Sequence, residues 1–344
     1  PSPIDRPAIR RMDARVVHPW ESFDKPNASR TVLGVGDGAY VFDAKGNRLL
    51  DGPGGMWCVN AGHGQQKIVD AIHQQAAQLS YTSPWSHPTE SAARLADRLA
   101  AVAPGDLDHV FYATGGSTAV DSALRFMMFY NNVLDRPEKK HIISRHDAYH
   151  GSTYLAAAVS GKSRDKSWLD TRLDTVHFIS SPNPYRRPEG MSVDAFKQFL
   201  IKELEDKIQE VGPDKVGAFI AEPILASGGV IVPPPGYHAA CLEICRRHDI
   251  IYISDEVVTG FGRLGHWYAS EPVFDITPDI IISAKGLTSG YIPLSCVIIS
   301  DRLIQAVSGD SDRGSVFSNG FTYSGHPVAC AAGIANMEVF ESQE

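Results

Sequence analysis

Seven short apolar runs alternate with amphipathic segments along most of this chain, and this alternation limits the folds open to it. The runs are apolar throughout, as strands covered on both faces are, rather than apolar at every second residue. The pattern therefore predicts an α/β fold with a mostly parallel seven-stranded sheet flanked by helices. The runs are 109–112, 141–144, 175–179, 216–220, 250–254, 280–283 and 294–299; the helical patterns are 65–79, 89–102, 117–133, 194–211, 236–248 and 327–340.

A lysine follows one of these runs and an aspartate ends another. Lys285 comes just after 280–283, and Asp255 closes 250–254. A lysine that snorkels out to solvent and an aspartate that caps a turn would also explain them. Ligands of open parallel sheets bind beyond the carboxyl ends of the strands, so we expect both groups in one site. Pyridoxal phosphate needs this pair: an amine that forms a Schiff base with its aldehyde, and a carboxylate that keeps its pyridine nitrogen protonated.

Polar or aromatic residues follow three more runs. Gly116 and Ser117 open a helix after 109–112 and could curl around an anion, although a glycine turn with an N-cap is the simpler explanation. Tyr149 follows 141–144 and could stack on a planar ring or form part of a wall. Glu222 follows 216–220, next to Pro223, and could equally make a loop ion pair. Because five successive strand ends each carry a group that one cofactor could use, we expect a single shared cofactor site.

Taken together, these residues resemble the class III pyridoxal-phosphate-dependent aminotransferases, which have fold type I. The resemblance covers nearly the whole chain. The blocks that carry it are YHG (149–151), AEP (221–223) with GG (228–229) and PPPGY (233–237), SDEV (254–257) with TGFGR (259–263), SAKG (283–286) and TYSGHP (322–327).

The resemblance assigns roles to individual residues. It implies that Lys285 and Asp255 are catalytic, and that Thr322 reaches the phosphate from a neighbouring subunit of a homodimer, which could pair into a tetramer. Tyr149 is expected on one face of the cofactor ring and Val257 on the other. The full expected cofactor-binding set is Gly116, Ser117, Tyr149, His150, Glu222, Asp255, Val257, Lys285 and Thr322.

The resemblance also implies a domain plan. Residues 1–60, which include a hairpin of 39–42 and 48–50, would be the N-terminal part of a small α+β domain built from both termini. Residues 61–325 would form the large cofactor-binding domain, and 326–344 a linking helix into the rest of the small domain. Roughly 100 further residues are expected beyond Glu344, including the arginine that grips the substrate carboxylate.

Two departures from the family pattern bear on the reaction. The chain has GGSTAV (115–120) where most relatives have SGSEAN, and Val258 where glutamine is common. Val258 is similar to the amine and ω-amino-acid:pyruvate subgroup. We therefore expect transamination from a primary amine or ω-amino acid to a keto acid, with pyruvate favoured, by a ping-pong route. An aminomutase or decarboxylating transaminase on the same scaffold stays open; a non-catalytic regulatory domain would need a basic winged helix, which the sequence lacks.

Large aromatic residues suggest where the substrate binds. We expect Trp57, Trp85 and Tyr149 to line the substrate pocket, although both tryptophans could instead serve the core or a dimer contact.

Composition narrows the partners and the compartment. The net charge of −8, with acids and bases interspersed, argues against nucleic acid and anionic membrane as partners. No apolar run approaches the roughly 20 residues that span a bilayer. Five cysteines without a CxxC pattern indicate neither a zinc site nor a disulfide framework, so we expect no metal and a cytoplasmic protein.

Overall fold

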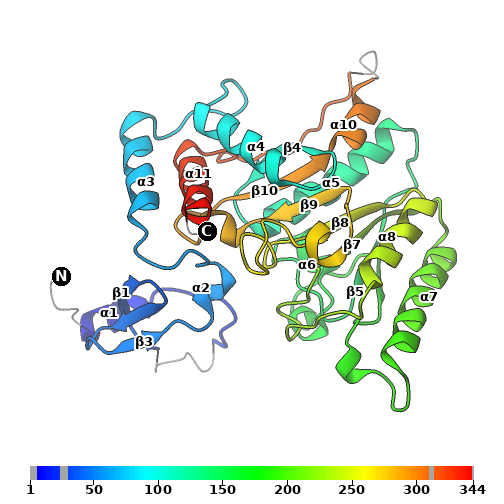
Figure 1. The fold of residues 1–344 in the computed structure, drawn as a ribbon, viewed down its shortest axis with the longest axis horizontal. Helices are drawn as coiled ribbons and strands as arrows, with labels where there is room; N and C mark the ends of the chain where they lie inside the picture. Colours follow the sequence, from blue (N-terminus) through cyan, green and yellow to red (C-terminus); the bar gives the residue numbers. More distant parts are fainter. Residues whose placement is uncertain (1–5, 24–29, 310–313, 343–344) are drawn as a thin grey trace.

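The computed structural model describes residues 6–23, 30–309 and 314–342. Its N-terminal part holds a three-stranded antiparallel sheet, apart from the main sheet (Figure 1). The predicted hairpin is present: Tyr40 pairs with Leu50, and the Asp43 side chain accepts hydrogen bonds from backbone amides within the turn. The elements of this part are α1 (Arg6–Asp13), β1 (Leu33–Asp37), β2 (Tyr40–Asp43), β3 (Arg48–Leu50) and α2 (Gly54–Trp57).

A seven-stranded sheet in the order β4-β10-β9-β8-β7-β5-β6 forms the centre of the molecule. Neighbouring strands are parallel except β10, which is antiparallel to both β4 and β9. The predicted mostly parallel sheet is therefore confirmed, with each run within one or two residues of a strand. The strands are β4 (Leu107–Ala113), β5 (His141–Arg145), β6 (Val176–Ile179), β7 (Val216–Ala221), β8 (Ile251–Asp255), β9 (Ile280–Ser283) and β10 (Ser295–Ser300).

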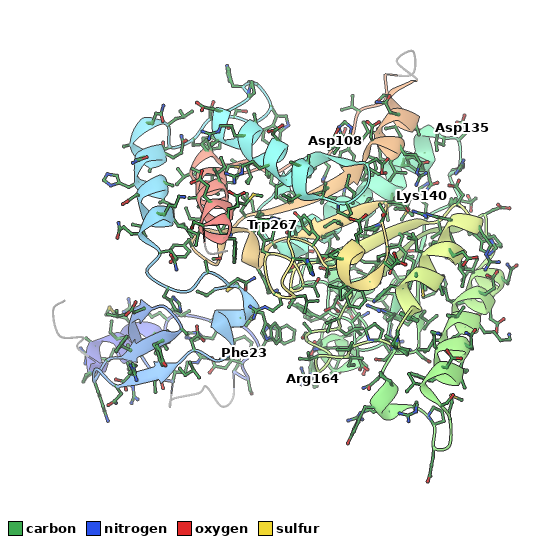
Figure 2. The ribbon with its side chains drawn as sticks, in the orientation of Figure 1. Phe23, Asp108, Asp135, Lys140, Arg164 and Trp267 are labelled. Carbon is green, nitrogen blue, oxygen red and sulfur yellow. The ribbon has the colours of Figure 1, made fainter. Side chains whose placement is uncertain are left out.

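Successive strand residues pack into different cores on the two faces of this sheet. Ile253 and Ile282 pack with residues of α5 on one face. Tyr252 packs with α7 and α8, and Ile281 with α4 and α11, in two further clusters. Side chains fill the space between the layers (Figure 2), which explains why the strands are apolar throughout. The long helices are α3 (Gln66–Gln78), α4 (Glu90–Val102), α5 (Gly116–Val133), α7 (Val193–Val211), α8 (Tyr237–Arg247) and α11 (Pro327–Glu341).

Several short helices were not predicted. They are α1, α2, α6 (Tyr154–Val159), α9 (Ser270–Phe274) and α10 (Asp301–Ser308). Helices of one or two turns repeat a 3.6-residue pattern too few times to be recognised. None of the helices in the described ranges is both long and apolar enough to cross a membrane.

The C-terminal helix α11 packs against α3 and α4 (Figure 1). Its buried residues include Cys330, Ile334 and Met337, which share a core cluster with Leu95 and Leu99 of α4. The division at residues 60 and 325 stays a prediction.

Candidate active site

The carboxyl ends of the central strands meet around one cavity of about 310 Å³. Nine of the expected residues line it together, eight from the cofactor-binding set and Trp57 from the substrate pocket, which places the ends of β8 and β9 beside the start of α5. These are Gly116, Ser117, Tyr149, His150, Glu222, Asp255, Val257, Lys285 and Trp57.

Lys285 stands at the end of β9 in a constrained backbone. Its φ of 46° lies in the left-handed region, which costs a residue other than glycine roughly 1–3 kcal/mol. The following glycine is required by space, because a Cβ on Gly286 would lie 2.5 Å from Nδ2 of Asn60. Asn336 Nδ2 donates to the Gly286 carbonyl at 2.8 Å. The strained turn is thus fixed from two sides, and it directs the lysine into the cavity.

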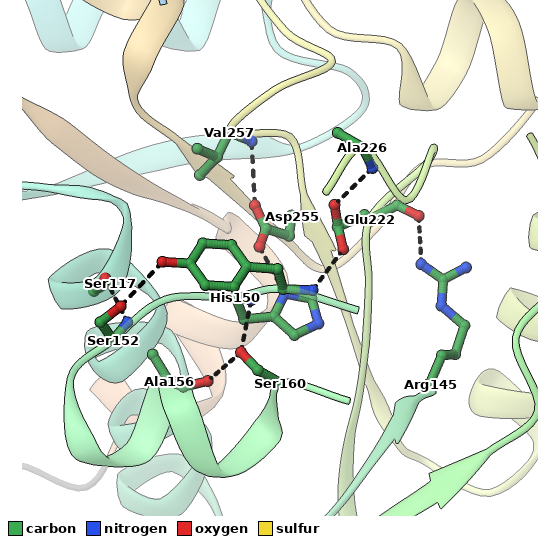
Figure 3. A network of polar contacts seen from close by, with 11 residues as sticks. Ser117, Arg145, His150, Ser152, Ala156, Ser160, Glu222, Ala226, Asp255 and Val257 are labelled. Carbon is green, nitrogen blue, oxygen red and sulfur yellow. Dashed lines mark hydrogen bonds and ion pairs between the residues drawn. The ribbon is translucent and has the colours of Figure 1, made fainter. Parts of the chain in front are cut away.

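Asp255 ends β8 as a carboxylate that is only 4% exposed. His150 Nδ1 donates to its Oδ2 at 2.7 Å, and the Val257 amide donates to Oδ1 at 3.2 Å (Figure 3). The His150 amide is itself held by Ser160 Oγ at 2.9 Å. A buried carboxyl group needs hydrogen-bond partners, and these contacts hold the Asp255 side chain in one orientation in the wall of the cavity.

Glu222 supports the loop that carries Tyr149. Its Oε1 accepts from the Tyr149 amide at 3.0 Å and its Oε2 from the Ala226 amide at 3.1 Å (Figure 3). Arg145, which is fully buried, donates through Nη2 to the Glu222 carbonyl at 2.5 Å. Burial raises the pKa of the Glu222 carboxyl above its ordinary value. Glu222 thus acts on the loop backbone through two amide hydrogen bonds.

The opposite end of the cavity is the N-terminus of α5. Its first residues are Gly116 and Ser117, whose free amides and the helix dipole favour an anion there. Ser117 Oγ accepts from the Ser152 amide at 3.0 Å, and Ser152 Oγ lies 3.0 Å from the Tyr149 hydroxyl. The loop around residue 150 therefore connects the anion-binding end to the Asp255 end.

Several lining residues were not identified from the sequence. Trp20 comes from the segment between α1 and β1, and its ring lies edge-on to Tyr149 with centroids 6.0 Å apart. No periodic pattern marks this segment, so the sequence offered no signal for it. The other unexpected lining residues are Met56, Gly151, Lys162, Arg164, Asp165 and Ser227; Val258, noted for its departure from the family, also lines the cavity.

Two expected residues are not brought to this cavity. The Trp85 residue is 67% exposed, and Thr322 is exposed with its carbonyl accepting from the Tyr81 hydroxyl at 2.8 Å. Neither belongs to the cavity lining of this single chain. The Trp85 ring lies against Gly320, where an added Cβ would be 3.2 Å away, and Thr322 precedes Tyr323, whose ring packs edge-on against Tyr81.

The fold is that of a fold type I transferase, and the sequence defines the family. Residues 25–344 match the family model for aminotransferase class-III. The chain therefore belongs to the class-III aminotransferases, a family of pyridoxal-phosphate-dependent enzymes.

Individual relatives differ in their acceptors. The chain is 38% identical over 316 residues to putrescine–pyruvate aminotransferase of Pseudomonas aeruginosa, covering 91% of this chain and 68% of the relative. It is 37% identical over 325 residues to diaminobutyrate–2-oxoglutarate transaminase of Halomonas elongata, covering 93% and 69%. Among solved structures, the omega transaminase of Pseudomonas jessenii in complex with PMP superposes with a TM-score of 0.94 at 33% identity, covering 97% of this chain and 75% of that one.

Proposed function

We propose that this chain binds pyridoxal phosphate in the described cavity and transfers an amino group from a primary amine or ω-amino acid to a keto acid, with pyruvate as the favoured acceptor. The observation that carries the proposal is that Lys285 and Asp255, from the ends of adjacent strands, line the same cavity as the N-terminus of α5.

The chemistry of the cavity fits this cofactor. Pyridoxal phosphate has a basic nitrogen on one side of a flat ring and a phosphate on the other. The cavity offers the buried Asp255 carboxylate near one end, amides and Ser117 at the other, and the Tyr149 ring in between. Contacts are close at the anion end, because a Cβ on Gly116 would lie 3.4 Å from a Val257 methyl group. The arrangement suits a flat, doubly charged ligand.

The bound cofactor would supply an electron sink for the carbanion formed next to the substrate nitrogen. The Lys285 Nζ would accept the proton from the substrate carbon and return it. Asp255 would hold a proton on the ring nitrogen, and the hydrogen bond from His150 Nδ1 fixes the carboxylate for this task. Glu222 keeps Tyr149 in position through the amide of that residue.

Pyruvate is favoured by the lining of the cavity. Val258 contributes an apolar side chain where relatives often carry an amide, and Trp20, Met56 and Trp57 add further apolar surface. These apolar walls suit the methyl group of pyruvate, which has no second carboxylate to bind. The two named relatives use different acceptors at nearly equal identity, so this part of the proposal rests on the residues of the cavity.

A screen of amine donors against pyruvate tests the reaction. We expect alanine to form with at least one primary amine, and borohydride reduction to fix the cofactor on Lys285, as detected by mass spectrometry. Lys285→Ala is the control and should lose both. Conversion of a substrate without any added keto acid would favour an aminomutase instead. A wild-type protein that carries no cofactor on Lys285 would overturn the proposal.

We also propose a homodimer in which each subunit completes the site of the other. The support is the exposed aromatic surface of Tyr81, Trp85 and Tyr323, beside which Thr322 lies, because monomers rarely leave such residues uncovered together. Thr322 from this surface would reach the phosphate end of the partner's cavity, and Trp85 would reach its substrate end.

Mixing two inactive variants tests this arrangement. Lys285→Ala removes the amine in its own subunit, and Thr322→Arg should block the site of the partner. After random reassociation of the two variants, roughly a quarter of the sites should contain both an intact Lys285 and an intact Thr322. Activity should return to about that fraction. A mixture that stays inactive, although the subunits are shown to exchange, contradicts shared sites.

A further inference from the structure

One cation in the cavity wall is not used by the proposed chemistry. Lys162 lies in the loop after α6, and its Nζ donates to the carbonyl oxygen and to Oγ of Ser227, the latter at 2.5 Å. The same Nζ lies 5.9 Å from the centre of the Tyr149 ring. The ammonium is therefore held at a defined place beside the aromatic platform of the site.

The partners of Lys162 are all neutral. Within the parts of the chain that the structure describes, no carboxylate lies within ion-pair distance of its Nζ. The neighbouring charges are already paired, because Arg164 Nε donates to Asp165 Oδ1 at 3.1 Å and the Arg164 side chain is 84% exposed (Figure 2). An amine with only neutral partners makes a stronger hydrogen bond to an anion than to another neutral group.

We propose that Lys162 binds the remote carboxylate of an ω-amino acid donor and so makes such donors, rather than diamines, the preferred substrates of this cavity. The inference rests on the proposed transamination and deepens it: Lys162 would bind the remote carboxylate of the donor, and the arginine expected beyond Glu344 would bind the carboxylate of the acceptor. The acidic residues of the lining do not offset the charge: Asp255 is held by His150, Glu222 by two amides, and Asp165 by Arg164. The second ammonium of a diamine donor would therefore lie close to the Lys162 ammonium, and no carboxylate of the cavity lining would be free to pair with it.

Three donors of equal length test the proposal in the full-length holoenzyme: 5-aminopentanoate, pentylamine and 1,5-diaminopentane. The donor half-reaction is followed alone, without acceptor, by the loss of the absorbance of the lysine-bound cofactor. The second-order rate constant of this half-reaction equals kcat/KM for the donor in a ping-pong reaction. In wild-type protein it should be highest for 5-aminopentanoate and lowest for the diamine. If the diamine is the best donor of the three, the proposal is overturned without any variant.

Substitution then assigns the preference to the residue. In Lys162→Met, the ratio of kcat/KM for 5-aminopentanoate over pentylamine should fall by roughly tenfold to hundredfold, mainly through KM, as expected for one charge-assisted hydrogen bond. Lys162→Arg keeps the charge and should retain most of the preference. An unchanged ratio in Lys162→Met, or in Lys162→Gln if the methionine variant does not fold, refutes the assignment.

Lys166 provides a matched control. Its Nζ also donates to a backbone carbonyl, that of Ala158 at 2.7 Å, and also lies over an aromatic ring, 4.6 Å from the centre of Phe178. It does not line the cavity, so Lys166→Met should leave the ratio as in wild type. If none of the three donors converts the wild-type cofactor, the proposed function itself fails. If all donors react but the ratios do not respond to residue 162, only the assignment of Lys162 fails.

Discussion

Gly151 is the glycine whose replacement should most directly disturb the anion-binding end of the cavity. Its φ of +142° is one that residues with a side chain rarely adopt, and forcing it costs roughly 1–3 kcal/mol. A Cβ at this position would lie 2.4 Å from Ser117 Oγ and 2.7 Å from Ser117 Cα. Because backbone is involved, rotation of the serine side chain cannot remove the clash, and overpacking of this kind costs about 1–3 kcal/mol more. Gly151→Ala should therefore cost roughly 2–6 kcal/mol in total.

This cost is divided between stability and cofactor binding. If Ser117 stays in place, the strain lowers the free energy of unfolding; if Ser117 moves, the phosphate loses its donors. We expect Gly151→Ala to weaken pyridoxal phosphate binding at least about tenfold, equal to 1.4 kcal/mol, and to lower the midpoint of thermal unfolding. The control is Gly190→Ala, where φ is +77° but no atom lies within 4 Å of the added Cβ. Equal cofactor affinity and equal midpoints in the two variants would refute the steric argument.

Three further outcomes follow from the structure. Asp255→Asn keeps the size of the side chain but replaces the carboxylate with a neutral amide. Single-turnover deamination should therefore slow by roughly 10-fold to 1000-fold, while the cofactor still attaches to Lys285. An unchanged rate would mean that the carboxylate is not needed. Burial lowers the pKa of His238 from 6.5 to about 3. Between these two pH values the unfolded chain carries a proton on this histidine and the folded chain does not, so stability falls as the pH drops below 6.5. This proton linkage should remove roughly 3 kcal/mol of stability by pH 4, and urea unfolding of His238→Asn should lack that part of the pH dependence. Trp57→Ala should shift the donor preference toward bulkier amines with the cofactor absorbance retained, and an unaltered preference would remove Trp57 from the substrate pocket.

The sequence predicted the sheet and the centre of the site for the same reason. Parallel strands bury both faces, so they appear as uniform apolar runs, and their carboxyl ends meet at one edge of the sheet. Residues just after those runs, such as Asp255 and Lys285, could therefore be grouped from their positions in the chain alone. The roles given to individual residues beyond this grouping came from the resemblance and stay predictions.

The direction of β10 could not be predicted by this reasoning. The run at 294–299 is as apolar as its neighbours, because β10 is covered on both faces although it is antiparallel to β4 and β9. The residues that line the cavity from loops could not be predicted from the sequence for a related reason. Trp20 and Lys162 follow no strand end, and their positions depend on contacts with residues far away in the sequence, such as Tyr149 and Ser227.

Three consecutive residues link the separate parts of the site. The Tyr149 amide binds Glu222, the His150 ring binds Asp255, and Gly151 packs against Ser117. One loop therefore sets the positions of the Tyr149 ring, the Asp255 carboxylate and the first turn of α5 together. A displacement at any of the three positions should then disturb the other two, because a short backbone segment cannot shift one residue and leave its neighbours in place. The Gly151→Ala variant tests this coupling as well: it should impair the Asp255 end of the cavity, with slower deamination by whatever cofactor remains bound, and not the phosphate end alone.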